Sequence, residues 1–208
     1  MTLRERFLKG QYSELARAFD QGRLSLNPKS QNWIAASLAL TGRVDDALAL
    51  ATTESSLPRF YIAVSMTRSS RFREARALLI ENALQTQDRS RFFAYQGFGF
   101  YAFFEGRFQK ALFWANKAWL IALKSKSLHE RVLSADLRGH ALLQMGEIEK
   151  GLESLETALD TANRIDNKTH LNALRASIAI ASATADSNHL EQNEVLERLL
   201  KESTHYDS

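Results

Sequence analysis

The sequence RFFAYQGFGFYAFFEGRFQKALFWANKAWLIALK, residues 91–124, holds the clearest copy of a pattern that recurs along this chain. It contains eight of the twelve Phe residues, two of the three Trp and two of the five Tyr. Its pattern predicts a helix that ends near Phe104, a turn at Glu105-Gly106-Arg107, and a second helix that starts at Phe108. Weaker copies of this two-helix unit occur on both sides of the stretch, so the chain is built from internal repeats.

The turn of this unit occurs five times along the chain. Each copy begins with Gly or Ser, has a large apolar residue two positions later, and has a mostly small residue five positions later. Gly accepts the positive φ that ends a helix, and the small residue lets the paired helices approach closely. A second small residue precedes four of the turns by seven positions, at Ala35, Ala63, Gly99 and Gly139. The turns span residues 10–15, 42–47, 70–75, 106–111 and 146–151.

These turns and small positions resemble the tetratricopeptide repeat (TPR) family, whose units are helix-turn-helix pairs of about 34 residues. The resemblance covers roughly residues 3–164, and the longer units are similar to the longer-helix variants of bacterial regulatory and sensor proteins. It implies an all-α fold, a right-handed α-solenoid of about five antiparallel helical hairpins. Residues 1–208 would form a single TPR-like domain, with a degenerate capping unit at about 168–203.

Helix boundaries are predicted from capping residues. Asn27-Pro28 and Leu57-Pro58 each resemble an N-cap followed by a first-turn Pro, and Ser127 resembles an N-cap. Residues 2–9 are too short for a full first helix, a vaguer turn is expected around Asp186-Ser187-Asn188, and residues 204–208 are expected to fray. The helices predicted from these signals span about 29–41, 58–69, 88–104, 128–145, 168–185 and 190–202.

Composition excludes several classes of protein. The chain has no Cys, which removes disulfides, thiolate nucleophiles and Cys-based zinc sites. Its longest uncharged apolar run, residues 92–104, is shorter than the roughly 20 residues that cross a bilayer as a helix. Glu5 and Glu14 interrupt an N-terminus that has no continuous apolar core, so it is not expected to be a signal peptide. We therefore expect a cytoplasmic, soluble protein without a membrane span.

Sequence signals for catalysis are weak. Gly97-Phe98-Gly99 has no Lys or Ser/Thr at phosphate-loop spacing, and it is interpreted as a helix-packing feature. The five His residues are scattered and form no H-E-x-x-H pattern. No nucleophile has a base at a recognisable spacing. We expect no enzyme, no metal site and no cofactor.

Binding signals are stronger. In stacked helical hairpins the first helix of each pair lines a concave face. If the geometry of the TPR family applies, the groove residues lie thirteen, ten, six and three positions before each turn. The helix over residues 88–104 is apolar nearly all round, so its second side requires a cover. A partner peptide or helix is the expected cover, with self-association into a homodimer and burial in the chain's own core as alternatives. The candidate partner-binding residues of the groove are Asn32, Phe60, Val64, Phe93, Gln96, Phe100, Phe103, Asp136 and His140.

Charged residues add two expectations. Asp136 and His140 are four positions apart on one helix, so they face the same side and can touch. Arg68, Arg71 and Arg89 lie at successive turns and helix starts, where stacking would align them along one edge that suits an acidic partner. Interleaved acidic residues and a net charge of only +3 argue against nucleic acid.

Together these features favour a non-catalytic adaptor or chaperone-like scaffold that holds a partner peptide or helix in an aromatic concave groove. The alternative is a ligand-sensing regulatory domain that controls a transcription or signalling partner. The adaptor predicts an open groove, whereas the sensor predicts a closed pocket for a small effector.

Overall fold

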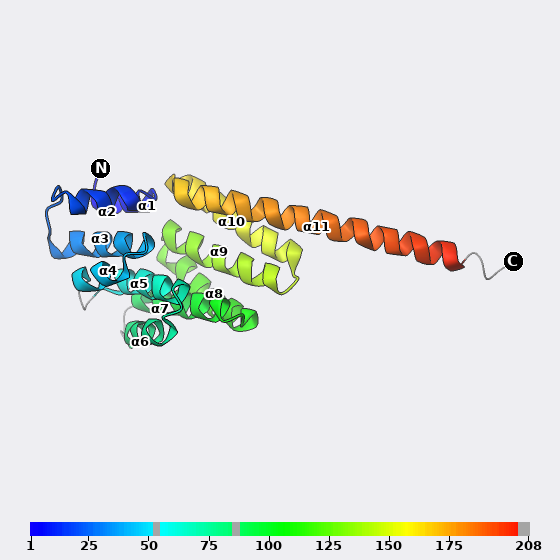
Figure 1. Ribbon diagram of the computed structural model, residues 1–208, viewed down its shortest axis with the longest axis horizontal. Helices are drawn as coiled ribbons and strands as arrows, with labels where there is room; N and C mark the ends of the chain where they lie inside the picture. The colour runs from blue at the N-terminus through cyan, green and yellow to red at the C-terminus, as the bar shows by residue number, and fades with distance from the viewer. Residues whose placement is uncertain (52–54, 85–87, 204–208) are drawn as a thin grey trace.

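The structure, a computed structural model, describes residues 1–51, 55–84 and 88–203 (Figure 1). These residues form helices and no strand, so the all-α prediction is confirmed. Within the described ranges, no helix is both long and apolar enough to span a membrane. The helices are α1 (Leu3–Leu8), α2 (Tyr12–Asp20), α3 (Pro28–Leu40), α4 (Val44–Leu50), α5 (Ser56–Arg68), α6 (Phe72–Ala83), α7 (Asp88–Phe104), α8 (Phe108–Ser125), α9 (Leu128–Gln144), α10 (Ile148–Ile165) and α11 (Lys168–Ser203).

Consecutive helices pack in neighbouring pairs. Helix α3 packs on α4, α5 on α6, α7 on α8, and α9 on α10. The first helices of these pairs also contact one another in the order α3, α5, α7 and α9. The second helix of each pair contacts the first helix of the next, as α6 contacts α7 and α8 contacts α9. The right-handed superhelix of about five hairpins stays a prediction.

All five predicted turns contain a residue in the left-handed region. The φ angles are 80° at Gly10, 85° at Gly42, 61° at Ser70, 73° at Gly106 and 78° at Gly146. In each turn the amide of the next residue donates to the carbonyl five positions back, as Arg107 does to Ala102 at 2.9 Å. This is the Schellman closure, which satisfies carbonyl groups that the helix end would leave unpaired.

Small residues bring paired helices into close contact, as the sequence predicted. A Cβ added to Gly99 would lie 2.6 Å from Leu137 Cδ2 and 3.4 Å from the carbonyl oxygen of Ala111. A Cβ added to Gly139 would lie 2.6 Å from Leu155 Cγ and 3.0 Å from the carbonyl oxygen of Gly151. The Gly99–Ala111 and Gly139–Gly151 contacts each join the small residue seven positions before a turn to the small residue five positions after its start.

Two of the predicted caps are confirmed and one is displaced. The Asn27 side chain accepts hydrogen bonds from the amides of Lys29 and Ser30, and Ser127 accepts one from Glu130. Helix α5 begins at Ser56, two residues before Pro58, because Pro is tolerated anywhere in the first turn, where its missing N–H has no intrahelical partner.

The predicted turn at residues 186–188 is wrong. Helix α11 runs without a break from Lys168 to Ser203, and Figure 1 shows that it extends beyond the other helices. The chain has no Gly or Pro after Gly151. Asp, Ser and Asn each lower helix stability by less than about 1 kcal/mol, which does not suffice to end a helix. The predicted fraying of residues 204–208 lies outside the described residues.

The two ends of the helical array meet at the start of α11, which the sequence did not indicate. Lys9 Nζ lies 3.2 Å from Asp166 Oδ2, and the Thr169 hydroxyl donates to the carbonyl oxygen of Gly10 at 2.9 Å. Asn167 Nδ2 donates to the Tyr12 hydroxyl at 3.4 Å. Figure 1 shows α1 and α2 beside this end of α11. The N-terminal helices therefore contact the segment that begins α11.

The turn at Ser70 offers a test of the left-handed caps. We expect Ser70→Gly to raise the free energy of unfolding by about 1 kcal/mol, because a left-handed conformation costs a residue with Cβ about 1–2 kcal/mol and Gly entropy offsets part of the gain. The matched control is Ser69→Gly, at φ −91°, which should lower stability. Urea denaturation of both variants measures the difference, and a Ser70→Gly variant that is no more stable than the wild type would contradict the assignment.

Candidate functional site

A cluster of five rings from five helices lies in the interior of the array. It consists of Phe7, Tyr12, Tyr61, His129 and His170, and we call it the central cluster. Phe7 is fully buried, with its ring centroid 5.0 Å from Tyr12, 5.5 Å from Tyr61 and 6.1 Å from His129. The Tyr61 hydroxyl and His129 Nε2 are 2.8 Å apart, and the His129 and His170 rings are 6.4 Å apart. His129 lines one cavity, and Tyr12, Tyr61 and His170 line another.

The second of these cavities, which we call the aromatic groove, has a volume of about 460 Å³. It is lined by α5, the C-terminal parts of α3 and α7, the middle of α9, the start of α11 and Tyr12 at the start of α2. Seven of the twelve residues that the sequence singled out lie there: Phe60, Val64, Arg68, Phe100, Phe103, Asp136 and His140.

Aromatic rings form one part of the groove. Phe60 is buried, and its ring centroid lies 6.2 Å from that of Phe100. Phe103 is half-buried and lies 6.0 Å from Phe104, which is 42% exposed. The groove therefore has a buried aromatic floor at Phe60 and an exposed aromatic rim at Phe104, a residue that the offset rule did not select.

Polar side chains form the other part of the groove. His140 Nε2 lies 3.3 Å from Asp136 Oδ1 and 3.4 Å from the Ser177 hydroxyl, so the predicted contact between Asp136 and His140 is formed. The hydrogen bond to Asp136 raises the pKa of His140 above its usual value. Burial lowers the pKa of His170; the negative charge of Asp136 partly opposes this shift, and the positive charge of Arg68 adds to it. At neutral pH the groove thus combines the neutral imidazole of His170 with the cationic guanidinium of Arg68.

Phe93 and Gln96 are corrections to the predicted groove. Phe93 is fully buried, and the fully buried Gln96 donates from Nε2 to the carbonyl oxygen of Leu133 at 2.6 Å. Helix α7 contacts α5, α6, α8 and α9, so the chain itself covers most of the aromatic helix. A partner is therefore not needed to cover all of these rings. Asn32 is half-buried on α3 and lines neither cavity.

The predicted basic edge is not formed. Arg71 pairs with Glu74 at 2.6 Å and with Asp45 at 3.0 Å on the outer turns. Arg68 lines the aromatic groove, and Arg89 lines the other cavity. The three arginines do not align along one edge. Acidic residues on neighbouring turns pair with Arg71, whereas Arg68 and Arg89 each line a cavity.

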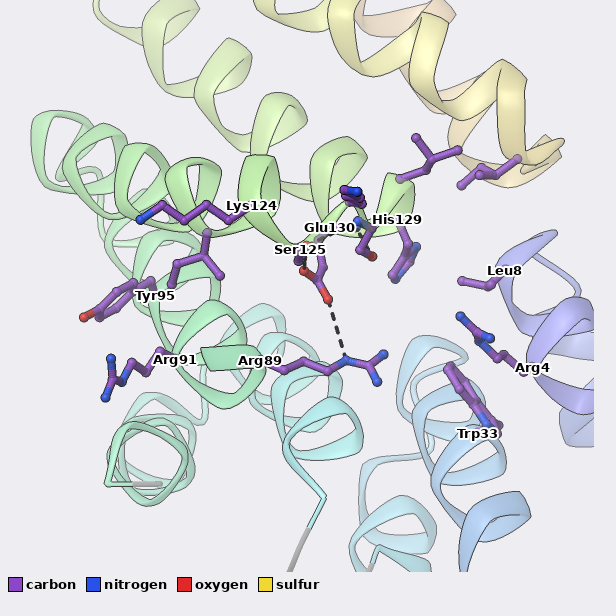
Figure 2. Close-up of a pocket in the computed structure, with 15 residues that line it drawn as sticks. Arg4, Leu8, Trp33, Arg89, Arg91, Tyr95, Lys124, Ser125, His129 and Glu130 are labelled. Carbon is purple, nitrogen blue, oxygen red and sulfur yellow. Dashed lines mark hydrogen bonds and ion pairs between the residues drawn. The ribbon is translucent and has the colours of Figure 1, made fainter. Parts of the chain in front are cut away.

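The other cavity, which we call the basic cavity, has a volume of about 910 Å³ and is drawn in Figure 2. Figure 2 shows Arg89 reaching across it toward Glu130, with Arg4 and Trp33 on one side and Arg91, Tyr95 and Lys124 on the other. Sequence reasoning missed this cavity, because its lining comes from six helices (α1, α3, α7, α8, α9 and α10) and the α8–α9 connection. The available signal was a set of basic residues near helix ends. The charged lining residues are Arg4, Arg89, Arg91, Lys124, Lys126 and Glu130.

His129 is the member of the central cluster that also lines the basic cavity. Burial lowers its pKa to about 3, and the positive charges of His170, Arg89 and Arg4 contribute to the shift. Its Nδ1 has no hydrogen-bond partner among the described residues. An unsatisfied buried polar atom typically costs about 1–3 kcal/mol. His129 is thus a neutral ring with one ring nitrogen left available.

The described residues contain no group of three or more His, Asp or Glu side chains that could hold a metal ion. Comparison of the chain with protein-family models, with curated proteins and with solved structures found no match. The chemistry of the two cavities is therefore the basis for a functional proposal.

The buried His129 predicts a specific pH dependence of stability. Below its usual pKa of 6.5 the unfolded chain protonates this ring, whereas the folded chain keeps it neutral down to about pH 3. The free energy of unfolding should therefore fall as pH falls through this window, by at most about 1.4 kcal/mol per pH unit for one His. Urea denaturation at a series of pH values should give His129→Gln a shallower slope than the wild type. Equal slopes would contradict a neutral, buried His129.

The Asp136–His140 pair predicts a pH dependence of stability with the opposite sign. The pKa of His140 is raised, so its contribution to stability is present at low pH and is lost as pH rises through the raised value. We expect Asp136→Asn to lower the pKa of His140, as measured by NMR titration of the imidazole. Asp160→Asn, an exposed site on α10, is the matched control and should leave this titration unchanged. No shift in Asp136→Asn would show that the contact does not control His140.

Proposed function

We propose that this protein is a non-catalytic adaptor that holds a peptide or helix of a partner protein in the aromatic groove. One observation supports this most directly: the groove places the surfaces of Phe100, Phe103 and Phe104 beside the polar groups of Arg68 and His140. An apolar surface with a few convergent polar groups is the usual composition of a recognition site. The rings would bury partner side chains, and the polar groups would fix their orientation.

The proposal includes a TPR-like superhelix. Five Schellman turns with close small-residue contacts, and first helices that contact one another in sequence order, support this arrangement. In stacked helical repeats such helices form an extended concave surface. The aromatic groove is lined by these helices and by α11, so it has the position that a partner segment would occupy.

The energetics of the groove suit a weak, reversible complex. Burying one Leu or Phe side chain of a partner contributes roughly 1.5–3 kcal/mol. Two such side chains and a few hydrogen bonds, less the cost of ordering the peptide, give affinities on the order of micromolar. A segment with one or two large apolar side chains is therefore the expected ligand.

Arg68 adds a charge requirement to the ligand. It is exposed at the C-terminal end of α5, within the lining of the groove. A guanidinium forms bidentate hydrogen bonds with a carboxylate, which are stronger than bonds between neutral groups. We propose that the partner segment has an acidic residue close to its apolar anchor.

Selection of a random peptide library on the purified protein tests this function. We expect enriched peptides to combine a large apolar residue with Asp or Glu, and to bind with micromolar affinity by fluorescence anisotropy. Phe104→Asp and Arg68→Glu should each weaken binding about tenfold or more, because they remove the apolar rim and reverse the charge. Phe100→Asp should abolish binding.

Controls distinguish loss of the groove from loss of the fold. Arg73→Glu reverses the charge of an exposed side chain on α6 that lines neither cavity, and it should leave the affinity for the peptide unchanged. Circular dichroism should show that Phe104→Asp and Arg68→Glu keep their helical content. Phe100 packs against the core, so a collapsed Phe100→Asp variant would assign that ring to the core. Failure to enrich any peptide, or equal binding to folded Phe104→Asp and Arg68→Glu, would refute the adaptor.

A ligand-sensing regulatory domain is the second candidate, and the basic cavity favours it. Both cavities contact the central cluster, since His129 lines one and Tyr61 lines the other. A ligand in the basic cavity could therefore alter peptide binding in the aromatic groove. A sensor requires that the affinity for the ligand in the basic cavity and the affinity for the peptide in the aromatic groove depend on each other, whereas a simple adaptor does not.

A further inference from the structure

Exposed cationic side chains surround the basic cavity. Five cationic side chains and one carboxylate line it. The carboxylate of Glu130 is buried, lies 3.6 Å from Arg89 Nε, and accepts a hydrogen bond from the Ser125 hydroxyl at 2.7 Å. Glu130 is therefore largely neutralised, and the remaining cations give the cavity a positive potential.

Two arginines in the cavity act on the same ring. Arg4, Arg89 and His129 all line the basic cavity, and the positive charges of Arg89 and Arg4 both lower the pKa of His129. Figure 2 shows them extending toward each other from α7 and α1. Like charges that face a shared space repel, and an anion between them would remove the repulsion. The geometry thus leaves a position for negative charge beside His129.

Uncharged groups lie on the same side of the cavity. His129 Nδ1 is buried without a hydrogen-bond partner among the described residues, and Nε2 already contacts the Tyr61 hydroxyl. Helix α9 starts at Leu128, and its first turn lines the cavity. The N-terminus of a helix of this length carries partial positive charge and attracts phosphate and carboxylate groups. Cationic side chains and a helix N-terminus therefore converge beside the His129 ring.

The rest of the lining suits an organic body. Trp33, Tyr95, Leu8 and Ile121 supply aromatic and aliphatic surface around the charged centre. The volume of about 910 Å³ lies within the range of roughly 300–1,000 Å³ that is typical of small-molecule sites. A bare inorganic ion would leave most of this space unfilled.

We propose that the basic cavity binds a small organic phosphate, with its phosphate group between Arg4, Arg89 and His129 and its apolar or aromatic body against Trp33 or Tyr95. Guanidinium groups match phosphate oxygens bidentately, and phosphate carries enough charge to neutralise two arginines. The inference deepens the sensor candidate by naming its ligand class. It does not depend on a peptide in the aromatic groove.

Isothermal titration calorimetry at fixed ionic strength tests the proposal. The probes are phenyl phosphate, AMP and inorganic pyrophosphate, with phenol and adenosine as uncharged counterparts. We expect at least one organic phosphate to bind saturably with Kd at or below about 1 mM and more tightly than pyrophosphate. Its binding should also raise the pKa of His129 in an NMR titration, because an anion favours the imidazolium.

Charge-removal variants locate the site. Arg4→Gln with Lys124→Gln removes two cavity cations without touching the Arg89–Glu130 pair, and it should weaken phosphate binding about tenfold or more. Lys110→Gln, an exposed change outside both cavities, is the matched control and should bind as the wild type does.

Three results would overturn the inference. They are no saturable binding by any phosphate probe, equal binding to the folded double variant, and equal binding of the uncharged counterparts. If an acidic peptide bound through Arg4 and Lys124 while the phosphates did not, the cavity would be a protein-binding site instead. Phe104→Asp and Arg68→Glu should leave phosphate binding intact, so the outcome is separate from that of the aromatic groove.

Discussion

The fold depends on one backbone constraint, the left-handed residue that ends the first helix of each pair. This residue lets the following amide bond back to the carbonyl five positions earlier, so the helix ends with its carbonyl groups satisfied and the chain reverses. The next helix then packs directly on the previous one. Small residues on both sides of the turn set the distance between the two helices, and Gly99 and Gly139 leave no room for a larger side chain. Every pair from α3 to α10 uses this device.

The central cluster determines what the interior of the array can do. Phe7 comes from the shortest helix of the described chain, yet it is fully buried against rings from α2, α5 and α9. The cluster joins the N-terminal helices to the rest of the molecule and lies between the aromatic groove and the basic cavity. Its buried His129 stays neutral, because burial and the neighbouring positive charges both disfavour protonation. One side of the cluster therefore faces aromatic surface, and the other faces cations.

The sequence predicted part of the candidate site correctly. The offset rule placed Phe60, Phe100 and Asp136 in the aromatic groove, because positions on the first helix of a pair keep a fixed direction relative to the turn. It failed for Phe93 and Gln96, which lie nearer the start of α7, where neighbouring helices enclose that side. The basic cavity could not be predicted in this way, since no single helix contributes enough of its charge to form a pattern.

By itself, the sequence determined the helices, most of their boundaries and the five turns, because these depend on φ preferences, capping groups and side-chain spacing within a few residues. The contact of α1 and α2 with the segment that begins α11, and the two cavities of different chemistry beside the central cluster, follow from the tertiary arrangement alone. Lys9 and Asp166, which pair there, are 157 positions apart. Their meeting depends on how each helix pair packs on the next. That packing follows from how side chains interlock across each interface, which no local sequence pattern specifies.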